Sequence, residues 1–575
     1  YIDNKAYMGF RRLSIIDLDN GSQPMFNENK KIVITFNGEI YNYQDLRKEL
    51  IEKGHTFANN SDTEVLIHAY EEYGEDMLNK LRGMFAFVIW DSEKETLFGA
   101  RDFFGIKPFY YTIVDGNIIY GSEIKSILAH PAYKKEVNDV ALENYLTFQY
   151  SVLPETFFKG VYKLMPGHCF TFHNGQINIK RYWEPTFEAD ENKSLDDFVQ
   201  EIDDAMHDSV EHHKISDVEV GSFLSSGVDS SYVAATFNGD KTFTVGFDYE
   251  KYNEIDYAKA LSEKIQIDNY SKLVSSEEYW AAIPKIQYHM DEPLADPAAI
   301  ALYFVSQTAA KHVKVSMSGE GADEFFGGYN IYKEPLDTAG YRKLPKGLRK
   351  GLANVAQAIP FKFKGKNFLI KDIEERFIGN AFMFNEKERA KILKNPTGKY
   401  DHKELTKPFY DKVKDKDDVT KMQYIDINFW LIGDILLKAD KMSMAHSLEV
   451  RVPFLDREVF DVARTIPTKY KVNKSNTKYA MRMAAHKYLP DMVAEKKKLG
   501  FPVPIRIWLK DDKYYNMIKK AFTSEAAEKY FNTKELVKYL DDHKEGKADN
   551  SRKIWTVYMF LVWYNDFFGD SEYAA

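Results

Sequence analysis

The chain has 575 residues, of which 44% are hydrophobic and 29% charged, and its formal net charge is −9 at pH 7. Because this length exceeds what one hydrophobic core supports, we expect two or more domains. The acidic balance argues against a nucleic-acid partner, and the single cysteine, Cys169, excludes an internal disulfide framework. The single cysteine also fits a reducing cytoplasm, where we expect the protein. No apolar run approaches the ~18 residues that span a membrane, so we expect no membrane partner.

The first part of the chain is expected to be rich in strands, with two early helices. The apolar strand "KIVITFN" ends in the turn Asn37-Gly38, and helical spacing follows in "NYQDLRKELIEKG". Ser61 and Glu64 have the capping-box spacing that opens the second helix, "EVLIHAYEEYG". Two hairpins are predicted in "FYYTIVDGNIIYGSE" and "CFTFHNGQINIKRYW", and the second places Cys169 in a buried strand.

The pattern changes after the polar, acidic segment 184–197. We take 186–197 as a linker between a first domain, 1–185, and a second domain, 198–575. Strands are predicted in "VEVGSFLSS", "KTFTVGF", "YSKLVSS" and "HVKVSMSG", with helices between them, and this alternation indicates a parallel α/β sheet. Beyond about residue 330 the pattern is mostly helical.

A loop of small residues joins the first of these strands to a helix. Residues 225–231, "SSGVDSS", stand at a strand end, where ligands bind in open α/β sheets. Backbone N–H groups and hydroxyls there suit an anion at a helix N-terminus. Since Asp229 would repel phosphate unless a metal bridged them, the loop implies Mg²⁺. The alternative is a tight turn with serine caps.

A second loop has the same character. "KVSMSGEGADEFFGGY" again places Ser-Gly at the end of an apolar strand, followed by Glu320, Asp323 and Glu324. Two such strand-end loops suit one ligand, with donors for phosphate and carboxylates for a metal. The competing interpretation is that Asp323 and Glu324 only stabilise the start of the next helix.

These stretches resemble a known family. "SSGVDSS" is similar to the S-G-G-x-D-S-S pyrophosphatase loop of ATP-dependent amide-forming synthetases, with Ser226 where that pattern has Gly. "SGEGADE" and "LEVRVPFLD" are similar to stretches of the glutamine-dependent asparagine synthetases of bacterial type. So are, in the family's order, "RRLSIID", "FNGEIYNY", "SDTE", "LRGMFAFVIWD", "ARDFFGIKPFYY", "SEIKSI" and "KLGFPVPIR".

The resemblance implies a fold and a reaction. The first domain would be an α+β Ntn-type glutaminase with stacked β-sheets flanked by helices. The second would be an α/β, parallel-sheet synthetase domain of the ATP-pyrophosphatase type with many helices. Such enzymes are ligases that convert L-aspartate and ATP to β-aspartyl-AMP and pyrophosphate, and then form asparagine with ammonia taken from L-glutamine.

The resemblance also assigns roles in the second domain. Asp229 and Asp323 would hold Mg²⁺ on the triphosphate, and Glu320 would serve the adenylated intermediate and accept a proton from ammonia. Lys498 would neutralise the leaving phosphate or the developing oxyanion; a solvated lysine in a charged run is the alternative. The expected ATP-binding residues are Leu224, Ser225, Ser226, Gly227, Asp229, Ser230, Val245, Ser318 and Gly319.

In the first domain the resemblance implies a glutamine pocket. Arg12 would clamp the α-carboxylate of glutamine with its forked guanidinium. Asn37 and Gly38 would form the oxyanion hole, and Asp62 would bind the α-amino group, although a helix-capping role explains Asp62 equally well. Glu39 would support this turn and the amino group.

The family's glutaminase nucleophile, an N-terminal cysteine, has no counterpart in the chain, which begins at Tyr1. We therefore expect the extreme N-terminus of the enzyme to be missing and the glutaminase half to be inactive, leaving ammonia as nitrogen donor. A relative that amidates another carboxylate and a non-catalytic relative stay as alternatives. A homodimer is left open.

Overall fold

The computed structural model describes residues 1–248, 253–357, 372–398, 401–494, 496 and 503–569. Lys498, a predicted catalytic residue, lies outside the described residues. Among the described residues, no helix combines the length and apolarity needed to cross a membrane.

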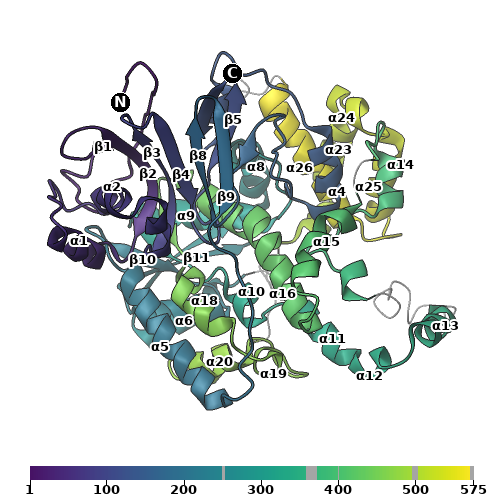
Figure 1. Ribbon diagram of the computed structural model, residues 1–575. Coiled ribbons are helices and arrows are strands. Elements are labelled where there is room, and N and C mark those ends of the chain that lie inside the picture. Colours follow the sequence, from purple (N-terminus) through teal and green to yellow (C-terminus); the bar gives the residue numbers. More distant parts are fainter. Residues whose placement is uncertain (249–252, 358–371, 399–400, 495, 497–502, 570–575) are drawn as a thin grey trace.

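A six-stranded antiparallel sheet with the order β1-β2-β3-β4-β8-β9 forms the centre of the first domain (Figure 1). A three-stranded sheet with the order β6-β5-β7 accompanies it. The strands are β1 (Met25–Phe26), β2 (Ile32–Ile40), β3 (Gly83–Asp91), β4 (Thr96–Arg101), β5 (Tyr110–Val114), β6 (Asn117–Gly121), β7 (Tyr162–Lys163), β8 (His168–His173) and β9 (Gln176–Arg181).

Alternation along β3 explains how the two sheets stack. Phe85, Phe87 and Ile89 belong to the large core, which also contains the apolar residues of α1 (Tyr43–Glu52) and α2 (Asp62–Tyr73). Ala86 and Val88 point to the opposite face, into a smaller core shared with residues of the three-stranded sheet. The predicted arrangement of stacked sheets flanked by helices is therefore confirmed.

Both predicted hairpins are confirmed. Val114 pairs with Asn117 and His173 with Gln176, so that each loop has two residues. Asp115-Gly116 and Asn174-Gly175 all have positive φ, as this hairpin turn requires. Cys169, on β8, is only 1% exposed, and burial raises the pKa of its thiol to about 11, so the prediction of a buried residue is also confirmed.

The predicted turn at Asn37-Gly38 is wrong, because β2 continues to Ile40 and both residues pair with β3. Gly38 has a φ of 147°, and a Cβ on it would lie 2.0 Å from the carbonyl oxygen of Met84. The glycine therefore serves a close approach between two strands inside the sheet.

The predicted capping box of α2 is only half formed. The Ser61 side chain accepts the N–H of Thr63, as a cap should. The Glu64 carboxylate instead accepts the N–H groups of Ala58 and Asn59, at 2.8 and 2.9 Å. Glu64 thus fixes the chain that leads into the helix.

The second domain contains a five-stranded parallel sheet with the order β12-β11-β10-β13-β14. Four strands are those predicted: β10 (Val220–Phe223), β11 (Lys241–Phe247), β12 (Asp268–Val274) and β13 (Val315–Met317). The fifth, β14 (Glu449–Arg451), lies in the region predicted to be helical and was missed. It adds the edge of the sheet that faces the first domain.

Helices make up most of the remainder. Helix α5 begins at Leu195, inside the predicted linker, with a capping box formed by Ser194 and Asp197. The other helices up to residue 357 are α3 (Ile124–Leu128), α4 (Asp139–Phe148), α5 (Leu195–His213), α6 (Val228–Phe237), α7 (Ile255–Ile265), α8 (Ser276–Met290), α9 (Ala298–Ala309), α10 (Ala322–Phe326), α11 (Glu334–Asp337), α12 (Ala339–Arg342) and α13 (Lys346–Gln357).

Helices also predominate among the described residues of the C-terminal third. Its helices are α14 (Glu386–Ile392), α15 (His402–Lys412), α16 (Asp418–Asn428), α17 (Leu437–Met444), α18 (Arg457–Ala463), α19 (Thr468–Lys471), α20 (Tyr479–Ala485), α21 (Asp491–Ala494), α22 (Ile505–Trp508), α23 (Asp512–Phe522), α24 (Glu525–Tyr530), α25 (Thr533–Lys544) and α26 (Ser551–Phe568). A π-helical segment, Leu431–Leu436, directly precedes α17.

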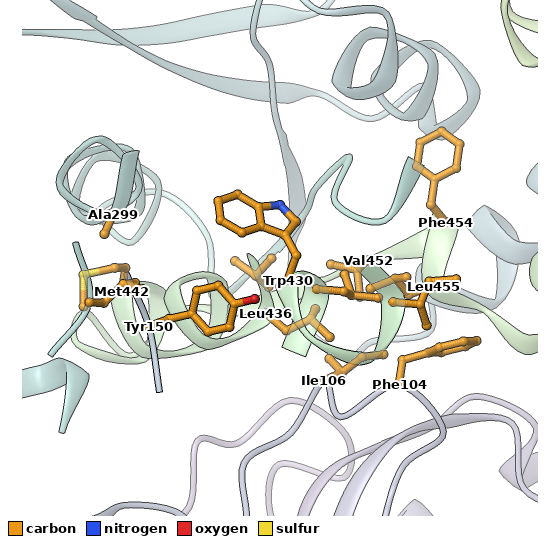
Figure 2. Packing of buried hydrophobic residues seen from close by; sticks show 14 of the residues in the cluster. Phe104, Ile106, Tyr150, Ala299, Trp430, Leu436, Met442, Val452, Phe454 and Leu455 are labelled. Carbon is orange, nitrogen blue, oxygen red and sulfur yellow. The ribbon is translucent and has the colours of Figure 1, made fainter. Parts of the chain in front are cut away.

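One continuous apolar core joins the two domains. Figure 2 shows Phe104 and Ile106 of the first domain in the same cluster as Trp430, Val452 and Leu455 of the second. The ring of Phe104 lies 5.1 Å from that of Phe325, at the end of the second loop predicted from the sequence. The packing between the domains therefore reaches the second predicted loop.

Candidate functional site

The two predicted loops face one cavity of about 640 Å³ at the carboxyl ends of β10, β11 and β13. This is where open α/β sheets bind their ligands. Of the residues predicted for ATP, metal or catalysis, those lining it are Leu224, Ser225, Ser226, Gly227, Asp229, Ser230, Val245, Ser318, Gly319, Glu320 and Asp323. We call this space the nucleotide cavity; the role of each residue stays a prediction.

The first loop is shaped by its own serines. The Ser225 N–H donates to Ser230 Oγ at 3.0 Å, and the Gly227 N–H donates to Ser225 Oγ at 3.1 Å. Gly227 precedes α6 without a side chain to cap the helix. The N-terminus of α6 therefore presents its partial positive charge to the cavity, as anion sites at helix ends do.

Ser226, the one departure from the family pattern, has a structural explanation. Its φ is not positive, so a side chain is tolerated there. The residue is 2% exposed, and its hydroxyl donates to Glu254 Oε1 at 2.6 Å. Ser226 thus fastens the loop to the start of α7.

The second loop approaches the first closely at a glycine. A Cβ on Gly319 would lie 2.7 Å from the backbone nitrogen of Ser230 and 3.0 Å from the Asp229 Cβ. Only a residue without a side chain allows this approach without displacement. Gly319 is therefore what brings the carboxylates of the two loops together.

Lys478 joins those carboxylates. Its Nζ lies 2.5 Å from Asp229 Oδ1 and 2.7 Å from Asp323 Oδ1, and the side chain is 1% exposed. Burial lowers the pKa of Lys478, and the Asp229 carboxylate opposes that shift. The sequence analysis missed Lys478, since "SNTKYAMRM" carries no signal that distinguishes it from a surface lysine.

A second group of charged residues also lines the cavity. Lys438 Nζ lies 2.5 Å from Asp296 and 2.6 Å from Asp434. Burial opposes the ionisation of Asp296, but Lys438 beside it holds the pKa of that carboxyl below its usual range. Arg552 also lines the cavity and donates to the side chain of Gln149. These residues were not predicted individually.

Apart from Arg12, the residues predicted to bind glutamine lie on β2 and at the start of α2. Asn37 Nδ2 donates to Ser122 Oγ at 3.2 Å. Asp62 Oδ2 accepts the N–H of Ile40 at 3.0 Å, so that the helix start is tied to the strand that holds Gly38. Since Ser61 caps α2, the capping role does not explain Asp62. Burial raises the pKa of Asp62 to about 6.

Glu39 does not support a turn; it is buried against the second domain. Its Oε1 lies 3.3 Å from Arg451 Nη2, and Arg451 Nε bonds Glu449 Oε1 at 2.9 Å. Burial, Asp62 and Glu449 raise the pKa of Glu39 well above its usual value, while Arg451 opposes the shift. The backbone oxygen of Arg451 accepts the N–H of Ser318 at 2.9 Å. Arg451 thus contacts both Glu39 of the first domain and Ser318 of the nucleotide cavity.

Arg12 is turned toward its own loop. Its guanidinium donates to the backbone oxygens of Ile16 at 2.5 Å, Asp17 at 2.9 Å and Leu18 at 3.3 Å. A Cβ on Gly21 would lie 2.2 Å from Arg12 Nη2, so the glycine makes room for it. These bonds fix the loop, and the predicted clamp on glutamine stays a prediction.

The fold and the site define a class of two-domain protein. One domain has an antiparallel sheet of the glutaminase type, and the other has a parallel sheet with a cavity at its carboxyl edge that suits a nucleotide. A family model described as "Glutamine amidotransferase domain" matches residues 1–183, and one described as "Asparagine synthase" matches residues 201–565. The chain belongs to the asparagine synthase family.

The sequences of named proteins agree. "Asparagine synthetase [glutamine-hydrolyzing] 1" of Bacillus subtilis is 47% identical over 98% of this chain and 90% of its own length. "Putative asparagine synthetase [glutamine-hydrolyzing]" of Mycobacterium bovis is 41% identical over 97% of this chain and 88% of its own length. "Asparagine synthetase [glutamine-hydrolyzing] 3" of B. subtilis is 32% identical over 87% of this chain and 80% of its own length.

Proposed function

We propose that the protein makes L-asparagine from L-aspartate, with ATP as the activating substrate and ammonia from L-glutamine as the nitrogen donor. The other products are AMP, pyrophosphate and glutamate. The observation that carries this proposal is the nucleotide cavity, where Asp229 and Asp323 of two facing loops share the Lys478 ammonium. The similarity to named asparagine synthetases over both domains supports it.

The first step forms β-aspartyl-AMP. An oxygen of the aspartate β-carboxylate attacks the α-phosphorus, and the bond from that phosphorus to the bridging oxygen breaks, so that pyrophosphate leaves with the electron pair. Catalysis of such a displacement depends on positioning and charge neutralisation. Residues 225–230 and the N-terminus of α6 would hold the leaving pyrophosphate, while Leu224 and Val245 would contact the nucleoside.

The donor set of the cavity fits a magnesium ion. Asp229 and Asp323 offer carboxylate oxygens, the ligands that Mg²⁺ prefers together with phosphate oxygens and water. When bound with ATP, the ion would neutralise charge on the phosphates. Lys478 already lies against both carboxylates, so it would share the neutralisation with the ion.

The second step forms the amide. The ammonia nitrogen attacks the β-carbonyl carbon, AMP leaves with the electron pair of the acyl–oxygen bond, and the nitrogen loses a proton. Glu320, half-buried in the cavity wall, would accept that proton. Lys438 and Arg552 would supply positive charge for the carboxylates of aspartate.

The nitrogen would come from the first domain. There Arg12 and Asp62 would hold the ends of glutamine, and Asn37 with the Gly38 N–H would stabilise the oxyanion. Glu39 would act on the same site through its buried contact with Arg451. We further propose a cytoplasmic location, because the one cysteine is a buried thiol that suits a reducing compartment.

Pyrophosphate release tests the proposal. With ATP, magnesium, ammonium and L-aspartate, we expect release that depends on every component and is matched by asparagine. Pyrophosphate release that requires another carboxylic acid would show that this acid, and not aspartate, is the acceptor. No release with any acid, from a folded protein that still binds ATP, would make the chain a non-catalytic relative.

A further inference from the structure

Two histidines meet on the first domain, apart from every residue assigned above. His55 follows α1, and His68 lies on α2, six residues beyond Asp62. Glu28, in the turn between β1 and β2, lies beside them. We call Glu28, His55 and His68, which come from three separate segments, the histidine cluster.

The cluster has the dimensions of a metal site. One side-chain ligand atom from each of the three residues lies within 4.8 Å of the other two. His68 Nδ1 lies 4.0 Å from Glu28 Oε2, and the two imidazole rings are 5.0 Å apart between centroids. Ligand atoms around a tetrahedral zinc ion stand about 3.4 Å apart, given bonds near 2.05 Å. Small side-chain movements would therefore bring the three ligand atoms to the separations found around a zinc ion.

The innermost residue of the cluster, His68, is fixed by its neighbours. His68 is completely buried, and the ring of Phe57 packs on its own at 4.6 Å. Glu71 Oε2 lies 2.8 Å from His68 Nδ1 and 3.8 Å from His55 Nδ1, so it contacts both histidines. Asn27 donates to the other oxygen of Glu71 at 2.7 Å. Glu71 is thus placed as a fourth ligand.

The surroundings attract cations. Glu64 Oε1 lies 3.8 Å from His68 Nε2, and Glu72 Oε2 lies 3.4 Å from His55 Nε2. These carboxylates place negative charge around the two imidazoles, which favours a cation there.

We propose that Glu28, His55 and His68 bind one divalent transition-metal ion, best matched by Zn²⁺, with Glu71 completing the site. Two imidazoles and two carboxylates suit zinc, cobalt or nickel, whereas Mg²⁺ and Ca²⁺ prefer oxygen alone. The ion fastens the β1–β2 turn and the segment after α1 to α2, and so acts as a structural metal. The proposal does not depend on the proposed catalytic reaction.

Cobalt(II) titration of the whole chain tests it. Four-coordinate cobalt(II) with nitrogen ligands absorbs strongly in the visible range. Cobalt(II) bound by the carboxylates of the nucleotide cavity would have oxygen ligands alone and would absorb weakly. We expect one saturable equivalent with strong absorption, competed away by Zn²⁺. His55→Ala should weaken binding at least about 100-fold, and Glu28→Gln about tenfold. His130→Ala, at an exposed histidine of the same domain, should leave it unchanged.

His55 is half-buried and Glu28 exposed, so both variants should fold, whereas a cavity at His68 would complicate the result. Zinc should also raise the midpoint of thermal unfolding of the unaltered chain and not that of His55→Ala. Absence of a saturable equivalent would overturn the proposal. So would strong absorption that survives both variants, or that is lost in Asp229→Asn and retained in His55→Ala.

Discussion

The nucleotide cavity and the region around the residues predicted to bind glutamine, here called the glutamine region, differ in which cation lies beside their carboxylates. In the cavity, Asp229 and Asp323 share Lys478, which comes from their own domain and lies 2.5 and 2.7 Å away. In the glutamine region the nearby acids are Glu39 and Asp62, and the cation beside Glu39 is Arg451 of the other domain, at 3.3 Å. Arg451 also bonds Glu449, so Glu39 shares this cation with a second carboxylate.

The difference shows in the ionisation of the acids. Burial and neighbouring carboxylates raise the pKa of Glu39 and of Asp62, and Arg451 offsets only part of each shift. The nucleotide cavity should therefore depend mainly on its own loops, whereas the glutamine region should depend on the contact between domains. Four changes test this comparison.

The largest effect is expected for Asp229→Asn. The change removes a predicted magnesium ligand and one partner of the buried Lys478, so ammonia-dependent pyrophosphate release should fall about 100- to 1,000-fold. Asp268→Asn, at an exposed acid on β12, is the matched control and should keep full activity. A loss below about tenfold would separate the carboxylate from catalysis.

Arg451→Met should destabilise the whole chain. It removes the cation that lies against both Glu39 and Glu449, so the free energy of unfolding in urea should fall by about 3 kcal/mol. Arg464→Met breaks a partly exposed pair with Asp461 and should cost less than about 1 kcal/mol. Equal losses in the two variants would contradict a special role for the contact between domains.

Asp62→Asn should change how stability depends on pH. The folded pKa of Asp62, about 6, lies above the ordinary value of 3.8, so the folded state binds a proton that the unfolded state releases between these values. Stability from this group is present below its unfolded pKa and is lost as pH rises through about 6. The free energy of unfolding of the variant, minus that of the unaltered chain, should therefore rise by about 2 kcal/mol between about pH 4 and pH 7. Parallel urea-unfolding curves over that range would show that Asp62 does not titrate there.

The smallest effect is expected at Ser226. Since its hydroxyl bonds Glu254, Ser226→Gly and Ser226→Ala should change the KM for ATP by less than about fivefold, the worth of one hydrogen bond. Ser225→Ala removes two contacts within the loop and should change it more. A larger effect at Ser226 than at Ser225 would mean that the Ser226 hydroxyl reaches phosphate during the reaction.

The strand-end loops were predictable because their chemistry is local. Small residues directly after apolar strands identify the loops around Asp229 and Asp323, and parallel strands then bring the two loops to one edge. Lys478 was not predictable, since it reaches that edge from a helix start about 150 residues later, and nothing in its neighbours marks it. Strand β14 was missed because two of its three residues, Glu449 and Arg451, are charged although they are buried.

In the first domain, local rules failed where tertiary contacts decide the outcome. Asn37-Gly38 has the composition of a turn, but the glycine is required by the adjacent strand. Glu39 was assigned to the same turn, yet its partner Arg451 lies more than 400 positions away in the chain. Hairpins such as β5–β6 were predicted correctly because both strands and their turn lie within a dozen residues.

The π-helical segment Leu431–Leu436 has a consequence for how the chain tolerates insertions and deletions. The helix that contains it lines the nucleotide cavity with Trp430, Ile435 and Lys438, and its continuation pairs Lys441 with Asp291 at 2.7 Å, next to the first domain. A π turn holds one residue more than an α turn. Deleting one residue there would turn the π turn into an α turn and leave the two flanking helices in register. The same deletion inside α17 would rotate everything beyond it by about 100°, so the π-helical segment is where this helix best tolerates the loss of a residue.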